Sequence, residues 1–131
     1  MKLNQIVAWV LRILAALIML QTLYFKFTGH PESIQIFSAI GMEPWGRYAT
    51  GIMELIAAIL ILIPATTYLG AILGLGLMGG AIFFHLTSLG IYVNGDPGLF
   101  IYALIVFISC LILLIMNRTR ILHKFRSVRS T

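Results

Sequence analysis

Four long stretches of this chain are apolar on every side, and short polar segments separate them. The stretches cover residues 3–27, 46–63, 68–91 and 99–116. A helix needs about 20 mostly apolar residues, with a range of roughly 17–25, to cross a bilayer. A membrane β-strand would instead alternate apolar and polar residues over a shorter length. The pattern therefore predicts an all-α fold, an integral membrane four-helix bundle.

The connection between the first two spans predicts a short additional helix. Pro31 suits its first position, and Gly41 suits the residue where it stops. Ile34, Phe37 and Ile40 recur at helical spacing, while most residues around them are polar. About ten residues are too few to cross a bilayer. We expect this helix to lie along the outer interface or to dip between the spans as a lid.

The two remaining connections are turns. Residues 64–67 leave so little room that the second and third spans must be antiparallel neighbours. Residues 94–97 form the turn before the fourth span. There we expect Asp96 to cap the fourth helix, with Pro97 at its first position.

Glycines mark the third span. Gly70 and Gly74 are four residues apart, and so are Gly76 and Gly80. Small residues let the backbones of membrane helices approach closely. We therefore expect the third span to be the most enclosed of the four.

Composition supports the membrane assignment and limits the class of protein. Of the 131 residues, 60% are hydrophobic and 10% are charged, and the mean hydropathy is +1.02. Ordinary soluble domains lie far from these values. We expect a single membrane domain over residues 1–131, with no room for a soluble catalytic domain. The net charge of +5 is assigned to lipid headgroups and topology, and no nucleic acid partner is expected.

Basic residues gather at the two ends of the chain and predict its orientation. The positive-inside rule places such residues in the cytoplasm, and an even number of spans puts both termini there. We expect the first span to be retained, because Arg12 interrupts its apolar run and no signal-peptidase site follows. The residues behind this orientation are Lys2 and, in a basic tail over residues 117–131, Arg118, Arg120, Lys124, Arg126 and Arg129.

Glu54 lies in the middle of the second span, among apolar neighbours. An ionisable group near the bilayer centre costs roughly 2.5–3.5 kcal/mol on insertion scales, so it usually faces a bundle interior and a partner. Arg12 and Lys26 are fourteen residues apart in the first span, which returns to nearly the same helix face about 21 Å further along. Gly51 and Ala58 share the face of Glu54 and allow a close approach.

The third span adds His85 to these polar positions. Helix geometry allows them to line one cavity that reaches from the midplane to the outer surface. With His85 neutral, they carry two positive charges and one negative charge, which favours an anionic or acceptor-rich ligand. The predicted ligand-binding residues are Arg12, Lys26, Glu54 and His85, with Gln21, Tyr24 and Tyr102 as additional walls.

Each of these residues also has a purely structural interpretation. Lys26 could reach the outer headgroups, Arg12 could pair with Glu54 only to stabilise the bundle, and a neutral His85 could bond a backbone carbonyl. No metal site is expected, since the histidines are scattered along the sequence. Cys110 has no second cysteine in the chain, which excludes an internal disulfide relay, and it is interpreted as a small apolar side chain.

Five short motifs carry a family resemblance: Trp9-Val10-Leu11-Arg12, Tyr24-Phe25-Lys26-Phe27-Thr28-Gly29, Ile40-Gly41-Met42, Gly51-Ile52-Met53-Glu54 and Phe84-His85. In these motifs the sequence resembles the DoxX family over about its first 90 positions. The resemblance implies a four-helix membrane bundle, an expected location in the bacterial inner membrane, and the polar positions Arg12, Lys26, Glu54 and His85. DoxX-like proteins include members linked to quinone-coupled thiosulfate oxidation, to oxidative-stress complexes and, in a distant animal relative, to receptor assembly.

The leading functional hypothesis is a redox-associated membrane protein that binds a quinone headgroup or a sulfur oxyanion. Arg12 and Lys26 would hold negative charge, while Glu54 and His85 would be the catalytic pair that exchanges protons. The chain carries no cofactor of its own, so catalysis would depend on a bound quinone or on a partner subunit of a quinone-linked oxidoreductase. The alternatives are a non-catalytic assembly factor or scaffold, which could be a homo-oligomer, and a small four-helix transporter. Cations near Glu54 disfavour an exporter of cationic drugs.

Overall fold

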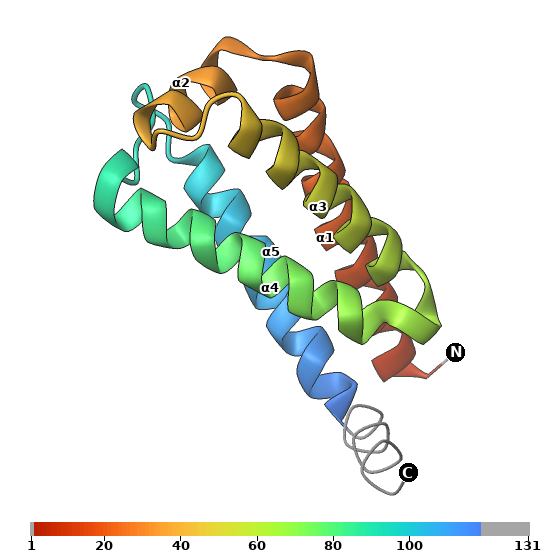
Figure 1. The fold of residues 1–131 in the computed structure, drawn as a ribbon. Helices are drawn as coiled ribbons and strands as arrows, with labels where there is room; N and C mark the ends of the chain where they lie inside the picture. The colour runs from red at the N-terminus through yellow and green to blue at the C-terminus, as the bar shows by residue number, and fades with distance from the viewer. Residues whose placement is uncertain (1, 119–131) are drawn as a thin grey trace, which may run out of the picture.

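The computed structural model describes residues 2–118 and shows a bundle of helices (Figure 1). The last part of the predicted basic tail, with Arg120, Lys124, Arg126 and Arg129, lies outside the described residues. The helices in chain order are α1 (Leu3–Thr28), α2 (Pro31–Ala39), α3 (Trp45–Leu62), the 3₁₀ turn η1 (Pro64–Thr66), α4 (Thr67–Phe84), the π-helical turn η2 (His85–Leu89) and α5 (Gly98–Met116).

Four of these segments are long and apolar enough to cross a membrane. They are Leu3–Thr28, Trp45–Leu62, Pro64–Leu89 and Gly98–Met116. The four-span, all-α prediction is therefore confirmed. The short helix between the first two spans is confirmed as α2: it has Pro31 at its first position, and Gly41 adopts a left-handed φ of 74° just beyond its end.

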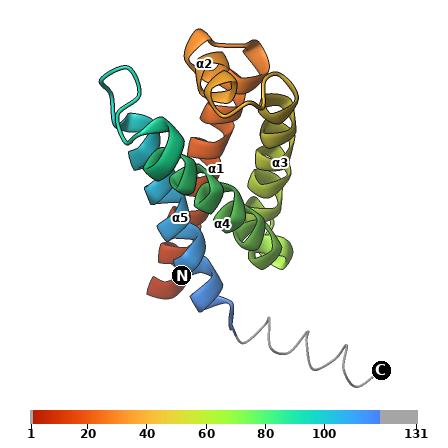
Figure 2. The ribbon, with the colours of Figure 1, turned by 60° about the vertical axis from the view of Figure 1, so that its left-hand side comes forward.

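The four long helices surround the bundle axis so that each has two neighbours. Helices α1 and α4 both pack against α3 and α5, which places α1 diagonally opposite α4. Helix α2 and the loop before α5 lie at one end of the bundle, whereas the start of α1, the turn η1 and the end of α5 lie at the other (Figures 1 and 2). The even number of spans thus brings the two ends of the described chain to the same side.

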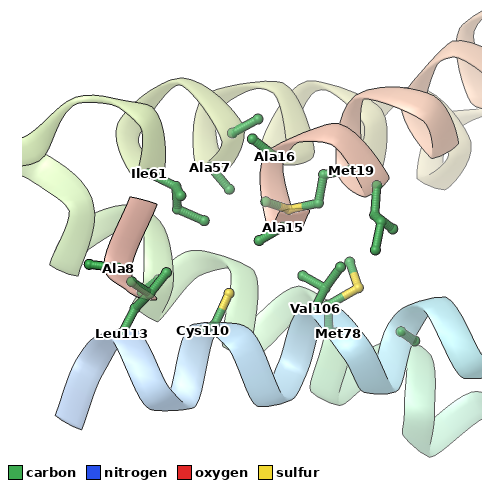
Figure 3. Packing of buried hydrophobic residues seen from close by; sticks show 14 residues of the cluster. Ala8, Ala15, Ala16, Met19, Ala57, Ile61, Met78, Val106, Cys110 and Leu113 are labelled. Atoms are coloured by element: carbon green, nitrogen blue, oxygen red, sulfur yellow. The ribbon is translucent and has the colours of Figure 1, made fainter. Parts of the chain in front are cut away.

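Small residues seal the half of the bundle that lies away from α2. A Cβ atom added at Gly70 would lie 2.6 Å from the backbone nitrogen of Ile61, so α4 touches the backbone of α3 there. One added at Gly74 would lie 2.9 Å from the sulfur of Cys110 on α5. Figure 3 shows the core around these contacts, including Ala8, Ala15, Ala57, Ile61, Cys110 and Leu113, which are buried. Close backbone packing of this kind stabilises helix association in membranes.

Helix α4 is not the most enclosed span, so that prediction was wrong. Within the 18-residue apolar stretch of each span, 39% of α3 is buried inside the bundle, against 28% of each of the other three spans. Gly70 and Gly74 do pack closely, as expected, but Cβ atoms added at Gly76 and Gly80 would meet no described atom within 4 Å. The physical reason is that α4 leaves α3 as it runs toward α2, so its later glycines lie beside open space.

A two-residue hairpin connects α4 to α5 and holds α2. Asn94 and Gly95 have φ values of 55° and 79°, and the backbones of Val93 and Asp96 exchange two hydrogen bonds of 3.0 and 3.1 Å across the turn. An Asn-Gly pair favours such left-handed turns. Asp96 Oδ1 accepts a 2.9 Å hydrogen bond from the backbone N–H of Gly98. The prediction was therefore wrong by one residue: Pro97 is the N-cap and Gly98 is the first helical residue, while Asp96, just before the cap, accepts from the first helical N–H.

Candidate functional site

A cavity of about 470 Å³ lies beneath α2, in the half of the bundle where the helices separate. Its walls come from all five helices and from η2, and most of the lining residues are apolar. Residues far apart in sequence meet here because α1 and α3 are neighbours and η2 continues α4 at the same end. The polar lining residues that matter for its chemistry are Thr22, Lys26, Glu32, Glu54, His85 and Tyr102.

The centre of the site is an ion pair between α1 and α3. Lys26 Nζ lies 2.9 Å from Glu54 Oε1, and the exposed fractions of the two side chains are 15% and 2%. The hydroxyl of Thr22 lies 2.8 Å from the other carboxylate oxygen of Glu54 and 3.0 Å from the carbonyl oxygen of Met19. A carboxylate with this burial needs such partners, because an isolated buried charge is strongly unfavourable.

Thr22 can serve Glu54 in either protonation state. A hydroxyl carries one donor hydrogen and two acceptor lone pairs. When Glu54 is ionised, Thr22 donates to its carboxylate. When Glu54 is protonated, Glu54 can donate to Thr22, which then donates to the Met19 carbonyl at 3.0 Å. The local geometry is therefore compatible with loss and gain of a proton at Glu54.

The helices meet closely at this pair because of where small residues lie. Gly51 precedes Glu54 by three residues and faces α1, where an added Cβ atom would lie 2.8 Å from the Phe27 ring. Thr22 and Lys26 are four residues apart, so both face α3 from successive turns of α1. The spacing of residues on two helices thus brings three polar side chains together.

A second ion pair holds the end of α1 that carries Lys26. Arg47 at the start of α3 is 5% exposed, and its guanidinium donates to both carboxylate oxygens of Glu43 at distances of 2.8 to 3.0 Å. Arg47 also donates to the backbone carbonyl of Lys26 and stacks on the Tyr48 ring at 4.5 Å. The last carbonyls of a helix lack intrahelical partners. Arg47 supplies one and so ties Lys26 to α3.

His85 lies at the opposite wall and is 5% exposed. Its Nδ1 atom is 3.0 Å from the carbonyl oxygen of Gly90, and its ring packs edge-on against Phe100. A carbonyl oxygen can only accept, so Nδ1 carries the hydrogen, and in the neutral ring Nε2 is an acceptor. Gly90 has a φ of 81° where η2 ends, which glycine tolerates. The π-helical turn therefore places His85 against the cavity.

The structure brings together four of the seven residues predicted to line the cavity: Lys26, Glu54, His85 and Tyr102. The described cavity walls do not include Arg12, Gln21 or Tyr24. Gln21 and Tyr24 are exposed, because they lie five and two residues before Lys26 and so point to the far side of α1.

Arg12 lies deeper in the bundle, about 10 Å along α1 from Met19 at 1.5 Å per residue. Its guanidinium carbon is 4.7 Å from the Trp9 ring. Lys26 and Thr22 contact the two oxygens of Glu54. With histidines neutral, the cavity lining itself carries no excess positive charge, since Lys26 pairs with Glu54 and Glu32 adds a negative charge.

Thr22 and the pair of Arg47 with Glu43 were not predicted from the sequence. Thr22 precedes Lys26 by four residues, and Thr50, which also lines the cavity, precedes Glu54 by four. A hydroxyl one turn from a charge within an apolar helix is a signal that could have been used. Glu43 and Arg47 show the same spacing. Within residues 2–118, no group of three His, Cys, Asp or Glu side chains could hold a metal ion.

A protein-family model described as the DoxX-like family matches residues 10–114. The match runs from α1 to α5 and includes every residue of the ion-pair site. Comparisons with curated proteins and with solved structures gave no match. The chain therefore belongs to the DoxX-like family and is an integral membrane protein with four candidate spans.

Proposed function

We propose that this DoxX-like membrane protein binds the headgroup of a quinone beneath α2 and takes part in membrane redox chemistry. The observation that carries the proposal is a cavity with mainly apolar walls and a buried ion pair, Lys26 with Glu54, at its centre. Pockets for small molecules are typically about 300–1,000 Å³, mostly apolar, with a few well-placed polar groups. The cavity of about 470 Å³ has these properties.

The residues present fit a neutral ring with carbonyl or hydroxyl groups. The ammonium of Lys26 has three N–H donors, of which the ion pair uses one. His85 Nε2 accepts a hydrogen bond in its neutral form, and the Tyr102 hydroxyl can donate or accept. Because the lining carries no excess positive charge, the geometry supports a neutral headgroup better than a sulfur oxyanion.

A bound quinone would supply two-electron chemistry that takes up two protons on reduction. In that setting Lys26 orients a carbonyl oxygen by donating to it. Glu54 is the group assigned to proton exchange, and Thr22 can hydrogen-bond it in both protonation states. His85 is held by Gly90 and accepts from a hydroxyl. Electrons would come from a partner redox subunit, and the cavity would face the outer side of the bacterial inner membrane, with both termini cytoplasmic.

A non-catalytic scaffold or assembly factor is the second candidate. The specific observation in its favour is that the polar groups satisfy one another: Glu54 is engaged by Lys26 and Thr22, and His85 by Gly90. In that case the cluster would stabilise the bundle and bind nothing. Structural ion-pair networks can resemble functional sites, so the two candidates must be separated by a binding measurement.

The test measures equilibrium binding of a labelled benzoquinone to the protein in lipid nanodiscs. The double variant Lys26→Met/Glu54→Gln removes the donor and the proton-exchanging group together, so no stranded charge disturbs the fold. Loss of a hydrogen bond to a charged group costs about 1.5–3 kcal/mol, which predicts binding weaker by about tenfold or more. Asp96→Asn is the matched control, because it makes the same carboxylate-to-amide change at the α5 cap, and its binding should equal that of the unmodified protein.

No saturable binding by the unmodified protein would overturn the proposal and favour the scaffold. Equal binding by the folded double variant would also overturn it, because the ion pair would then have no part in recognition.

A further inference from the structure

The cavity reaches the protein surface along α4, at a position near the middle of a membrane span. Gly76 and Gly80 both line it, and Gly76 is exposed. Gly76 also lies close to the centre of the apolar segment Pro64–Leu89. Because glycine has no side chain to fill the gap, an exposed glycine in the cavity wall marks an opening. The depth of this opening corresponds to the hydrocarbon region and not to the aqueous end of the bundle.

The opening lies between α3 and α4. At Gly70 the two helices are in backbone contact, with an added Cβ atom only 2.8 Å from the Ala57 carbonyl oxygen. Gly76 and Gly80 follow within three helical turns, and a Cβ atom added at either one would meet no atom within 4 Å in the described part of the chain. Figure 1 shows α3 and α4 separating toward α2. On α3, Thr50 lines the cavity. It lies seven residues before Ala57, whose carbonyl meets α4 at Gly70, so the two residues share nearly the same helix face.

The other walls are more obstructed. Exposed residues also line the cavity on α1 and α5, but there large side chains occupy the wall: Phe25 and Tyr102 are 37% and 38% exposed. The end near the aqueous phase is covered by α2, and the amide groups of Gln35 on α2 and Asn94 in the hairpin exchange two hydrogen bonds of 3.0 and 3.1 Å. Glycines at one wall and large or bonded side chains at the others make the α3–α4 wall the widest path.

We infer that the ligand is an amphiphile dissolved in the bilayer, which enters sideways between α3 and α4. Its polar head lies beside Lys26 and Glu54, and its apolar chain leaves past Gly76 and Gly80 into the lipid. The identity of the head rests on the proposed function, whereas the route rests on the opening. A water-soluble ligand without an apolar chain would not need an opening toward the hydrocarbon region of the bilayer.

The experiment compares two benzoquinones that share one ring, one with a decyl chain and one with a methyl group in its place. Gly80→Phe adds a ring to open space at the opening. We expect it to weaken binding of the decyl compound by about tenfold, the effect of about 1.4 kcal/mol of steric misfit, and to leave the methyl compound unchanged. Ile72→Phe, on the exposed face of α4, is the matched control and should change neither.

A second measurement does not depend on affinity. A decyl benzoquinone with a photoreactive diazirine on the chain carbons next to the ring should crosslink to α3 and α4 around Thr50 and Gly80. Crosslinks to α2, or to Phe25 and Tyr102, would overturn the route. Equal effects of Gly80→Phe on both compounds would do so as well. If neither compound binds the unmodified protein, the proposed function fails first, which distinguishes the two failures.

Discussion

The two members of the Lys26–Glu54 ion pair should differ sharply in the cost of their removal. Glu54 is 2% exposed near the middle of α3, while Lys26 is 15% exposed and lies two residues before the end of α1. Lys26→Met leaves a carboxylate at depth with Thr22 as its remaining partner. Glu54→Gln leaves an ammonium on a long stem, which can reach the surface, and the amide oxygen of the glutamine can still accept from Thr22.

These environments set the magnitudes. Stranding one charge of a buried pair costs about 3–5 kcal/mol, and we expect Lys26→Met to lie in this range. Glu54→Gln loses a charge-assisted hydrogen bond, worth about 1.5–3 kcal/mol, and part of that is recovered when Lys26 moves outward. Replacing both partners by neutral residues is often nearly neutral. The double variant should therefore lie within about 1 kcal/mol of the unmodified protein.

The chain contains its own reporter for this measurement. Cys110 is the only cysteine and is 0% exposed, so a thiol-reactive fluorophore responds when the bundle opens in detergent. We expect the unfolding midpoints to fall in the order unmodified protein, double variant, Glu54→Gln and Lys26→Met. The reasoning is refuted if Glu54→Gln is the more damaging change, or if the double variant loses the sum of the single losses.

Two further variants test the packing and the end of α1 with the same assay. Gly70→Ala should destabilise the bundle by about 1–3 kcal/mol through its clash with the α3 backbone, whereas Gly76→Ala should stabilise it by about 0.5–1 kcal/mol through helix propensity; equal effects would show that the helices do not touch at Gly70. Arg47→Lys should cost about 1–3 kcal/mol, because lysine cannot replace the planar fork that binds Glu43 and the Lys26 carbonyl. The exposed Arg118 is its control, and a midpoint for Arg47→Lys no lower than that for Arg118→Lys would contradict the role assigned to Arg47.

The spans and turns could be predicted because each depends on local sequence. Apolar length decides whether a helix crosses the membrane, and α1, α3 and α5 begin and end within about two residues of the expected positions, within the usual uncertainty of helix ends. Pro31, Gly41 and Asp96 act on their own neighbours, so their roles in α2 and at the start of α5 followed from the sequence.

Which residues form the site could be predicted only in part, since this depends on how the helices pack. Helical periodicity correctly placed Lys26 and Glu54 on facing sides, but it put Arg12 on the same stripe without showing that the core around Met19 lies between them. The Arg47 contact with the Lys26 carbonyl joins two helix ends across a loop. No periodicity within one helix contains that information.

Glycine brings α4 into contact with α3 in one half of the helix and leaves open space in the other half, and this difference creates the cavity. At Gly70 the missing side chain lets α3 make backbone contact, and the crossing there closes one half of the bundle. Two straight helices that touch at one point at an angle must separate beyond it. Gly76 and Gly80 lie on the separating side and leave the gap unfilled, while Glu54 and His85 face into it. A larger residue at Gly76 or Gly80 would narrow the opening without disturbing the crossing. Binding and folding can therefore be changed independently along this one helix, which is why Gly70 and Gly80 variants should separate a ligand-binding protein from a scaffold.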